Sequence, residues 1–169
     1  MAPEIERKFL LGEDPAPRLR DQEGQRLRQG YLAVDGTVEV RVRISPESAV
    51  VTIKAGRGIS RSEVEMPVSA TDAEELWAHT LGRRIEKTRY RLRLADTEVG
   101  GREAVAEVDV YHGDLAGLFV AEVEFESDAT AVAFTPPAWF SRELTGDERW
   151  SNANLARHGT PKEFIDELP

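Results

Sequence analysis

The sequence contains no cysteine, and this absence excludes several classes of site. Disulfide bonds, cysteine-ligated zinc, thiol catalysis and iron–sulfur clusters all require cysteine. Only His79, His112 and His158 are present, and none stands at a spacing typical of paired metal ligands. Gly56-Arg57-Gly58 is too short for a nucleotide-binding glycine loop and indicates a hairpin turn, and no Gly-x-Ser-x-Gly motif marks a serine nucleophile.

The chain also lacks long apolar runs and an excess of positive charge. Its apolar runs are a few residues long, whereas a membrane-spanning helix needs roughly 20. Glu4 and Glu6 near the start argue against a signal peptide. With 31 Asp and Glu against 22 Lys and Arg, the net charge is −9, which disfavours nucleic-acid or anionic-membrane binding through the overall field. We therefore expect a cytoplasmic protein with no membrane or nucleic-acid partner.

What the sequence does contain is charge that recurs every second residue, with apolar residues between. This alternation is typical of strands with one apolar and one charged face, and about eight such segments are present. They lie near residues 4–9, 28–34, 40–44, 52–54, 61–66, 87–94, 106–110 and 121–126. Helices are expected over 71–81, 137–144, 152–158 and 161–168, and a flexible loop over 14–25. We expect one α+β domain spanning residues 1–169.

The charges on these strands are sorted by sign. Basic rows are formed by Arg41 and Arg43 and by Lys87, Arg89, Arg91 and Arg93, and an acidic row by Glu122, Glu124 and Glu126. A solvated strand face usually mixes signs, because like charges two residues apart repel. Sorted rows favour a ligand of opposite charge, although a charged sheet facing water stays open as the alternative.

Charged faces turned into a closed barrel would create an interior suited to a metal–triphosphate complex. Carboxylates are hard oxygen ligands for Mg²⁺ or Mn²⁺, and Arg and Lys side chains suit phosphate oxygens. Phosphoryl transfer depends mainly on positioning, charge neutralisation and a metal ion. The composition of the charged rows supplies these requirements.

The N-terminal Glu4-Ile5-Glu6-Arg7-Lys8 resembles the Glu-x-Glu-x-Lys signature of the CYTH superfamily, the triphosphate tunnel metalloenzymes. Further motifs follow in the order of that family: Gln29-Gly30-Tyr31-Leu32, Arg41-Val42-Arg43, Thr52-Ile53-Lys54, Arg61-Ser62-Glu63-Val64-Glu65, Lys87-Thr88-Arg89, Glu107-Val108-Asp109 and Glu122-Val123-Glu124. The resemblance, closest to bacterial inorganic triphosphatases, covers nearly the whole chain. It implies a closed eight-stranded antiparallel β-barrel, a tunnel with a charged interior and helices packed outside.

The resemblance also implies a division of roles among the charged residues. Mg²⁺ or Mn²⁺ would be bound by Glu4, Glu6, Glu122 and Glu124, with Glu63, Glu65, Glu107 or Asp109 assisting. The phosphate chain would be bound by Lys8, Arg41, Arg43, Lys54, Arg57, Arg61, Lys87 and Arg89. Glu4, Glu6 and Lys87 form the expected catalytic set, with Lys87 as the proton donor to the leaving phosphate. An exposed turn position for Arg57 is an equal alternative, and Tyr31 lines the tunnel entrance or packs in the core.

The function implied by the resemblance is metal-dependent hydrolysis of inorganic triphosphate or a related triphosphate. Three alternatives stay open: an adenylyl cyclase of the class IV type, a thiamine or nucleoside triphosphatase, and a non-catalytic module that binds polyphosphate or nucleotide. The His-Phe signature associated with the cyclases is absent, which disfavours the first. A small-molecule triphosphate is the expected partner, and the assembly stays open, a homodimer included.

Overall fold

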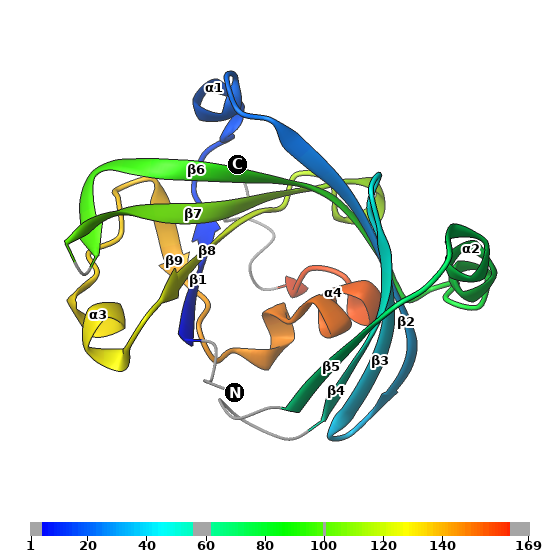
Figure 1. Cartoon of the computed structure of the whole chain (residues 1–169). Helices are drawn as coiled ribbons and strands as arrows, with labels where there is room; N and C mark the ends of the chain where they lie inside the picture. The colour runs from blue at the N-terminus through cyan, green and yellow to red at the C-terminus, as the bar shows by residue number, and fades with distance from the viewer. Residues whose placement is uncertain (1–4, 56–61, 100, 163–169) are drawn as a thin grey trace.

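A strongly curved antiparallel sheet of nine strands organises the chain (Figure 1). The computed structural model describes residues 5–55, 62–99 and 101–162. In sheet order the strands are β5 (Ser62–Pro67), β4 (Ala49–Ala55), β3 (Val38–Ile44), β2 (Gly24–Asp35), β6 (Arg84–Val99), β7 (Arg102–Tyr111), β8 (Phe119–Phe125), β1 (Ile5–Leu11) and β9 (Phe140–Glu143). The predicted α+β class with an antiparallel sheet is confirmed.

Short helices lie on both sides of the curved sheet (Figure 1). They are α1 (Ala16–Leu19), α2 (Ala70–Ala78), α3 (Asp128–Ala133) and α4 (Asn152–His158), with 3₁₀ turns η1 (Gly113–Leu115) and η2 (Glu148–Trp150). Helices α2 and α3 lie outside the curve, whereas α4 lies within it, against β2 and β6. No helix in the described ranges is long and apolar enough to cross a membrane.

The strand order leaves β5 and β9 at the two ends of the sheet. No backbone ladder joins these two strands in the part of the chain that the structure describes. The described strands thus form a nine-stranded antiparallel sheet, one strand more than expected. The additional strand is β9, which pairs with the free edge of β1.

Strand β9 lies where a helix over 137–144 was expected, and that prediction is wrong. Phe140 is buried, and its ring lies 5.0 Å from that of Phe9, centroid to centroid. Pairing with β1 satisfies backbone groups of 140–143 that a helix would have satisfied internally. The expected loop over 14–25 is also shorter than predicted, because it contains α1 and the start of β2.

Helices with a clear capping signal in the sequence were predicted, and one with an unusual capping box was missed. Helix α2 begins after Ser69, whose hydroxyl accepts from the backbone amide of Asp72, and α4 ends at Gly159, where φ is +73°. Both were expected, at 71–81 and 152–158. Helix α3 was missed: its capping box pairs Ser127 with Thr130, and the usual Glu or Gln is absent at the third position. The expected helix over 161–168 lies almost wholly outside the described residues.

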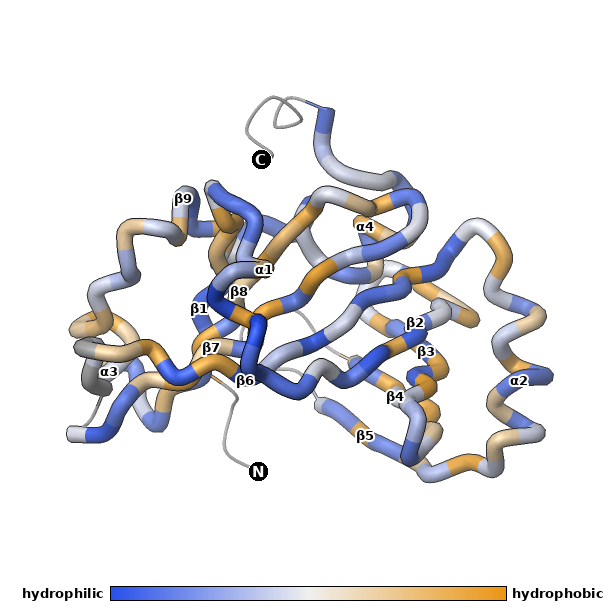
Figure 2. The backbone as a smooth tube through the Cα atoms, turned by 90° about the horizontal axis from the view of Figure 1, so that it is seen from above, coloured by the Kyte–Doolittle hydropathy of each residue, from blue (hydrophilic) through white to orange (hydrophobic). Residues whose placement is uncertain are grey.

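The two faces of the sheet bury different kinds of side chain, as the alternating colours along the strands in Figure 2 illustrate. The convex face carries an apolar cluster in which Phe9, Phe125, Phe134 and Phe140 pack against one another. Because side chains alternate along a strand, the charged residues between these apolar ones face the concave side. Burial of the convex face thus fixes the register, and a slip of one residue would expose the whole apolar set.

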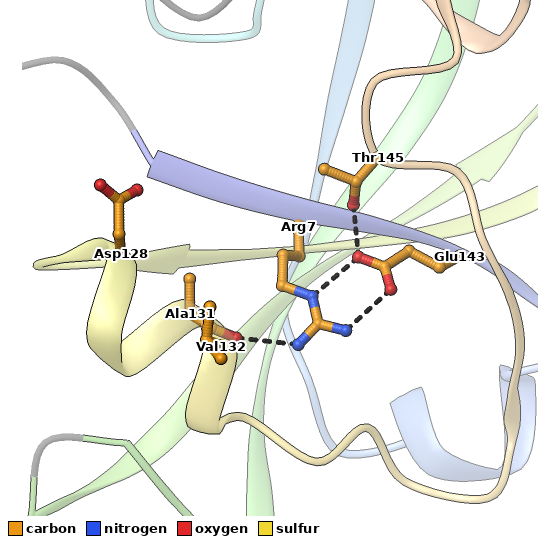
Figure 3. A pocket seen from close by; sticks show the side chains of 6 residues that line it. All are labelled: Arg7, Asp128, Ala131, Val132, Glu143 and Thr145. Carbon is orange, nitrogen blue, oxygen red and sulfur yellow. Dashed lines mark hydrogen bonds and ion pairs between the residues drawn. The ribbon is translucent and has the colours of Figure 1, made fainter.

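Arg7 fastens three elements together on the convex side (Figure 3). Its Nε and Nη2 donate to the two carboxylate oxygens of Glu143 on β9, at 2.7 and 2.8 Å. Its Nη1 donates to the carbonyls of Ala131 and Phe134 at the end of α3, at 2.8 and 2.9 Å. A cavity of about 380 Å³ lies beside this contact. The hydrogen bond from Arg7, together with one from Thr145 and the charge of Arg7, lowers the pKa of Glu143.

We expect Arg7→Lys to lower the free energy of unfolding by about 1–3 kcal/mol, because an ammonium cannot reproduce four hydrogen bonds of a planar fork. Urea unfolding at neutral pH measures the loss. Arg18→Lys, which alters an exposed ion pair with Glu13, is the control and should change stability by less than about 0.5 kcal/mol.

The Arg7 contribution should also depend on pH. The folded-state pKa of Glu143 is below its ordinary value of 4.5, so the ion pair stabilises above that value. The difference between wild type and Arg7→Lys should therefore narrow as the pH falls below about 4.5. Equal stability of the two proteins at neutral pH would contradict this account.

Candidate functional site

The predicted metal-binding and phosphate-binding residues of the described chain lie on the concave face. Glu6 stands opposite Glu124, and Lys8 opposite Glu122, across the β1–β8 ladder. The remaining members come from β3 (Arg41 and Arg43), β4 (Lys54) and β6 (Lys87 and Arg89). Glu4, Arg57 and Arg61 lie outside the described residues. Arg91 and Arg93, which continue the row of Lys87 and Arg89, are mostly exposed, with 74% and 80% of the side chain accessible.

Arg89 is the most heavily engaged cation of this face. Its Nε and Nη2 form a bidentate pair with Asp109, both at 2.7 Å. Nη2 also donates to Glu122 at 2.8 Å, and Nη1 donates to Glu107. Burial opposes the charge of this guanidinium, but the hydrogen bonds and charges of the carboxylates outweigh burial and raise its pKa. Arg89 thus joins carboxylates from β7 and β8 at one point.

Lys87 shares one of those carboxylates with Arg89. Its Nζ lies 2.5 Å from Oδ2 of Asp109, and 1% of the Lys87 side chain and none of the Asp109 side chain is accessible. Burial lowers the pKa of Lys87, while the charge and hydrogen bond of Asp109 oppose that shift. Asp109, which was expected to assist metal binding, pairs in this structure with the buried Lys87 and the partly buried Arg89.

Glu122 and Lys8 form the link to the C-terminal segment. Lys8 Nζ lies 3.3 Å from Oε1 of Glu122 and donates to the carbonyl of Trp150 at 2.9 Å. Burial would raise the pKa of Glu122, but the positive charges of Lys8, Lys87 and Arg89 lower it to about 2. Glu122 is therefore ionised at neutral pH although it is largely buried. A carboxylate that binds a metal cation needs this negative charge.

Arg43 of β3 and Lys54 of β4 are partly accessible, whereas Lys87 of β6 is buried. Arg43 pairs with Glu65 at 3.0 Å and keeps 34% of its side chain exposed, and Lys54 pairs with Glu63 at 2.8 Å and keeps 23%. The Lys54 contact joins the neighbouring strands β4 and β5, whereas the Arg43 contact reaches across β4 to β5. These partners leave the two cations free to exchange a partly exposed carboxylate for a ligand oxygen at small cost.

Two buried tyrosines, Tyr31 and Tyr111, lie between these groups. Burial raises the pKa of Tyr31 to about 12, with Arg41 opposing and Glu39 and Glu122 adding to the shift. Burial likewise raises the pKa of Tyr111 well above its usual value, and its hydroxyl donates to Asn152 of α4 at 2.7 Å. Sequence reasoning assigned no role to Tyr111. The available signal was its position two residues after Asp109 on β7, which places both side chains on the same face of the sheet.

The donor set of the face suits a divalent cation in its chemistry. Glu6, Glu122 and Glu124 offer hard carboxylate oxygens on adjacent strands, the ligands that Mg²⁺ and Mn²⁺ prefer. Within residues 5–55, 62–99 and 101–162, no group of three or more acidic or histidine side chains stands at metal-ligand spacing. Glu122 is engaged by Lys8 and Arg89, so a cation would replace these partners as its counter-charge.

Comparison with known proteins gives a family match and close relatives. The profile of the CYTH domain matches residues 2–145. A protein of Nitrosomonas europaea named inorganic triphosphatase is 42% identical over 90% of this chain and 96% of its own. One of the same name from Acetivibrio thermocellus is 36% identical over 94% of this chain and 96% of its own. The crystal structure of an inorganic triphosphatase, 38% identical, superimposes with a TM-score of 0.73 over 95% of this chain and 99% of that one.

We expect Asp109→Asn to lower the free energy of unfolding by about 3–5 kcal/mol, because it removes the buried counter-charge of the buried Lys87 and half of the bidentate pair with Arg89. Urea unfolding in EDTA measures the effect without any contribution from bound metal. Glu107→Gln, at a carboxylate that keeps 22% exposure, is the matched control and should cost clearly less. A loss below about 1 kcal/mol for Asp109→Asn would contradict an anchoring role.

Proposed function

The chain belongs to the CYTH family, and we propose that it is a divalent-metal-dependent inorganic triphosphatase. The observation that carries the proposal is the gathering of carboxylates and cations on the concave face. Glu122 on β8 contacts Lys8 on β1 and Arg89 on β6, and the partly accessible Arg43 and Lys54 lie on β3 and β4. Relatives that match nearly the whole chain are named inorganic triphosphatases, which supports the same activity. Single-domain organisation over residues 1–169 and closure of the curved sheet into a tunnel are part of this proposal.

The carboxylates of the concave face would bind the metal ion of a metal–triphosphate complex, and the cations would bind its phosphate chain. Glu4, Glu6, Glu122 and Glu124 would hold Mg²⁺ or Mn²⁺, which when bound neutralises phosphate charge and lowers the pKa of coordinated water. The phosphate chain would be held by Lys8, Arg41, Arg43, Lys54, Arg57, Arg61, Lys87 and Arg89. Lys8 lies 3.3 Å from Glu122, so a proposed phosphate-binding cation adjoins a proposed metal-binding carboxylate.

In the proposed reaction, a water oxygen bonds to a terminal phosphorus and the bridging P–O bond breaks. The products are orthophosphate and pyrophosphate, whose bridging oxygen departs with the electron pair. Arg41, Arg43 and Lys54 offset the negative charge that develops on the phosphoryl group and on the leaving pyrophosphate. Lys87 is the proposed proton donor to pyrophosphate, and the lowered pKa of its ammonium makes it a stronger acid for that step.

Phosphate release from inorganic tripolyphosphate tests the activity. With Mg²⁺ we expect fast release that exceeds release from ATP and that EDTA abolishes. Chromatography of the ATP reaction separates the alternatives, because a cyclase would form cyclic AMP and pyrophosphate. Tight tripolyphosphate binding without turnover in Mg²⁺ or Mn²⁺ would instead identify a binding module and reject the triphosphatase assignment.

Two substitutions separate the metal-binding and phosphate-binding regions. Glu124→Gln should reduce kcat at least about 100-fold, because a neutral amide is a poor ligand for a hard cation. Arg43→Ala should mainly raise the KM for tripolyphosphate, because it removes positive charge at an accessible position. Arg102→Ala, at a side chain that is 84% exposed, is the control and should behave as wild type. Wild-type rates for Glu124→Gln would remove this residue from the metal site.

A further inference from the structure

Gln29 on β2 is a buried polar residue whose acceptor has no protein partner in the described structure. Only 3% of the residue is exposed, and its Oε1 is buried without a hydrogen bond from any described residue. An amide oxygen in that position is removed from bulk water, and no described residue donates to it in exchange. Such a group destabilises the fold unless another state of the protein uses it.

A second buried atom without a partner is Nε of Arg41, which lacks an acceptor where Gln29 lacks a donor. It is a donor, and no described residue accepts from it. Arg41 stands opposite Tyr31 on β2, and Gln29 stands opposite Arg43 on β3. Gln29 and Arg41 are therefore diagonal neighbours on the concave face, a spacing that long side chains bridge.

The cations beside Gln29 donate elsewhere. Arg43 donates to Glu65, and Lys87, which is diagonal to Gln29 across the β2–β6 ladder, donates to Asp109. Arg41 is the neighbour whose Nε still offers a hydrogen. The acceptor and the donor are thus complementary, adjacent and both unsatisfied.

We propose that Gln29 is a positioning residue for Arg41, and that the two unsatisfied atoms pair when an anion binds. Phosphate oxygens take the two terminal nitrogens of Arg41, and Nε then donates to Oε1 of Gln29. The guanidinium is held in the plane that suits a bidentate contact with phosphate. This role rests on the proposed function, because it concerns the same concave face and a triphosphate anion.

The two unsatisfied atoms destabilise the free protein, and their pairing in the bound state would strengthen anion binding. In the free state both buried atoms are unsatisfied, and in the bound state one hydrogen bond satisfies both. Two consequences of opposite sign follow for an apolar replacement of Gln29. The free protein becomes more stable, because a buried acceptor is removed, while anion binding becomes weaker, because Arg41 loses its support.

The test is a double-mutant cycle on the full chain with inorganic tripolyphosphate as the probe. Isothermal titration calorimetry in EDTA measures binding without turnover. Gln29→Met, which keeps the length of the side chain, should weaken binding about tenfold in the wild-type background. In an Arg41→Lys background, which lacks the Nε donor, the same change should weaken binding less than about twofold.

The melting temperature supplies a second readout. Replacing a glutamine with a merely structural role would lower it, whereas the proposed role predicts an increase. The melting temperature of the free Gln29→Met protein should rise by about 2–4 °C. Gln25→Met, at an exposed position four residues earlier on the same strand, is the matched control and should alter neither quantity. Gln29→Leu repeats the measurement with a second apolar side chain should the methionine variant fold poorly.

The outcomes separate this inference from the proposed function. Equal weakening in both backgrounds, unchanged binding by Gln29→Met, or a lower melting temperature with no coupling to Arg41 would overturn the positioning role. Wild-type protein that binds tripolyphosphate but does not hydrolyse it would reject the triphosphatase and leave this inference standing. Wild-type protein that does not bind tripolyphosphate would overturn both.

Discussion

The guanidinium of Arg89, held between three carboxylates, is the interaction on which the concave face depends. Asp109, Glu107 and Glu122 come from two neighbouring strands and would repel one another without a shared counter-charge. Arg89 supplies that charge in a planar fork that pairs with Asp109 through two nitrogens, a geometry that a lysine ammonium cannot reproduce. Lys87 and Lys8 complete the neutralisation from either side. The strands that carry these groups can therefore approach closely enough to pack the apolar convex face behind them.

The alternation of charged and apolar residues was sufficient to predict both faces of the sheet. Phe9, Val108 and Val123 are buried on one side, while Lys8, Asp109 and Glu122 lie on the other, as a period of two requires. The CYTH resemblance was likewise predicted from the order of the motifs and is confirmed by the family match. Strand β9 could not be predicted in the same way. Its four residues become a strand because the edge of β1 is available, a tertiary condition that local sequence does not contain.

The ion-pair partners of individual charged residues could not be predicted either, because they too depend on which strands pair and in which register. Arg89 was expected to bind phosphate and Asp109 to assist a metal, since residue type alone offers those roles. Cross-strand register gives these residues partners within the protein in the described structure: it places Arg89 directly opposite Asp109 and places Glu107 opposite Glu122. The role assigned to a charged side chain thus depends on which residue lies across the ladder. Gln29 is a further case, because only burial and the lack of a partner distinguish it from an ordinary polar strand residue.

The C-terminal segment extends the site beyond the residues that match the family. The CYTH match ends at residue 145, yet the carbonyl of Trp150 accepts from Lys8 and the side chain of Asn152 accepts from Tyr111. Both contacts come from a segment that enters the curve of the sheet, where Trp150 and Leu155 pack with Ile85 and Leu10. Apolar burial therefore holds the backbone carbonyl that orients a proposed phosphate-binding lysine. The ammonium of Lys8 contacts both this carbonyl and Glu122. A change in the packing of the C-terminal segment would therefore move the positive charge that lies beside the proposed metal ligand Glu122.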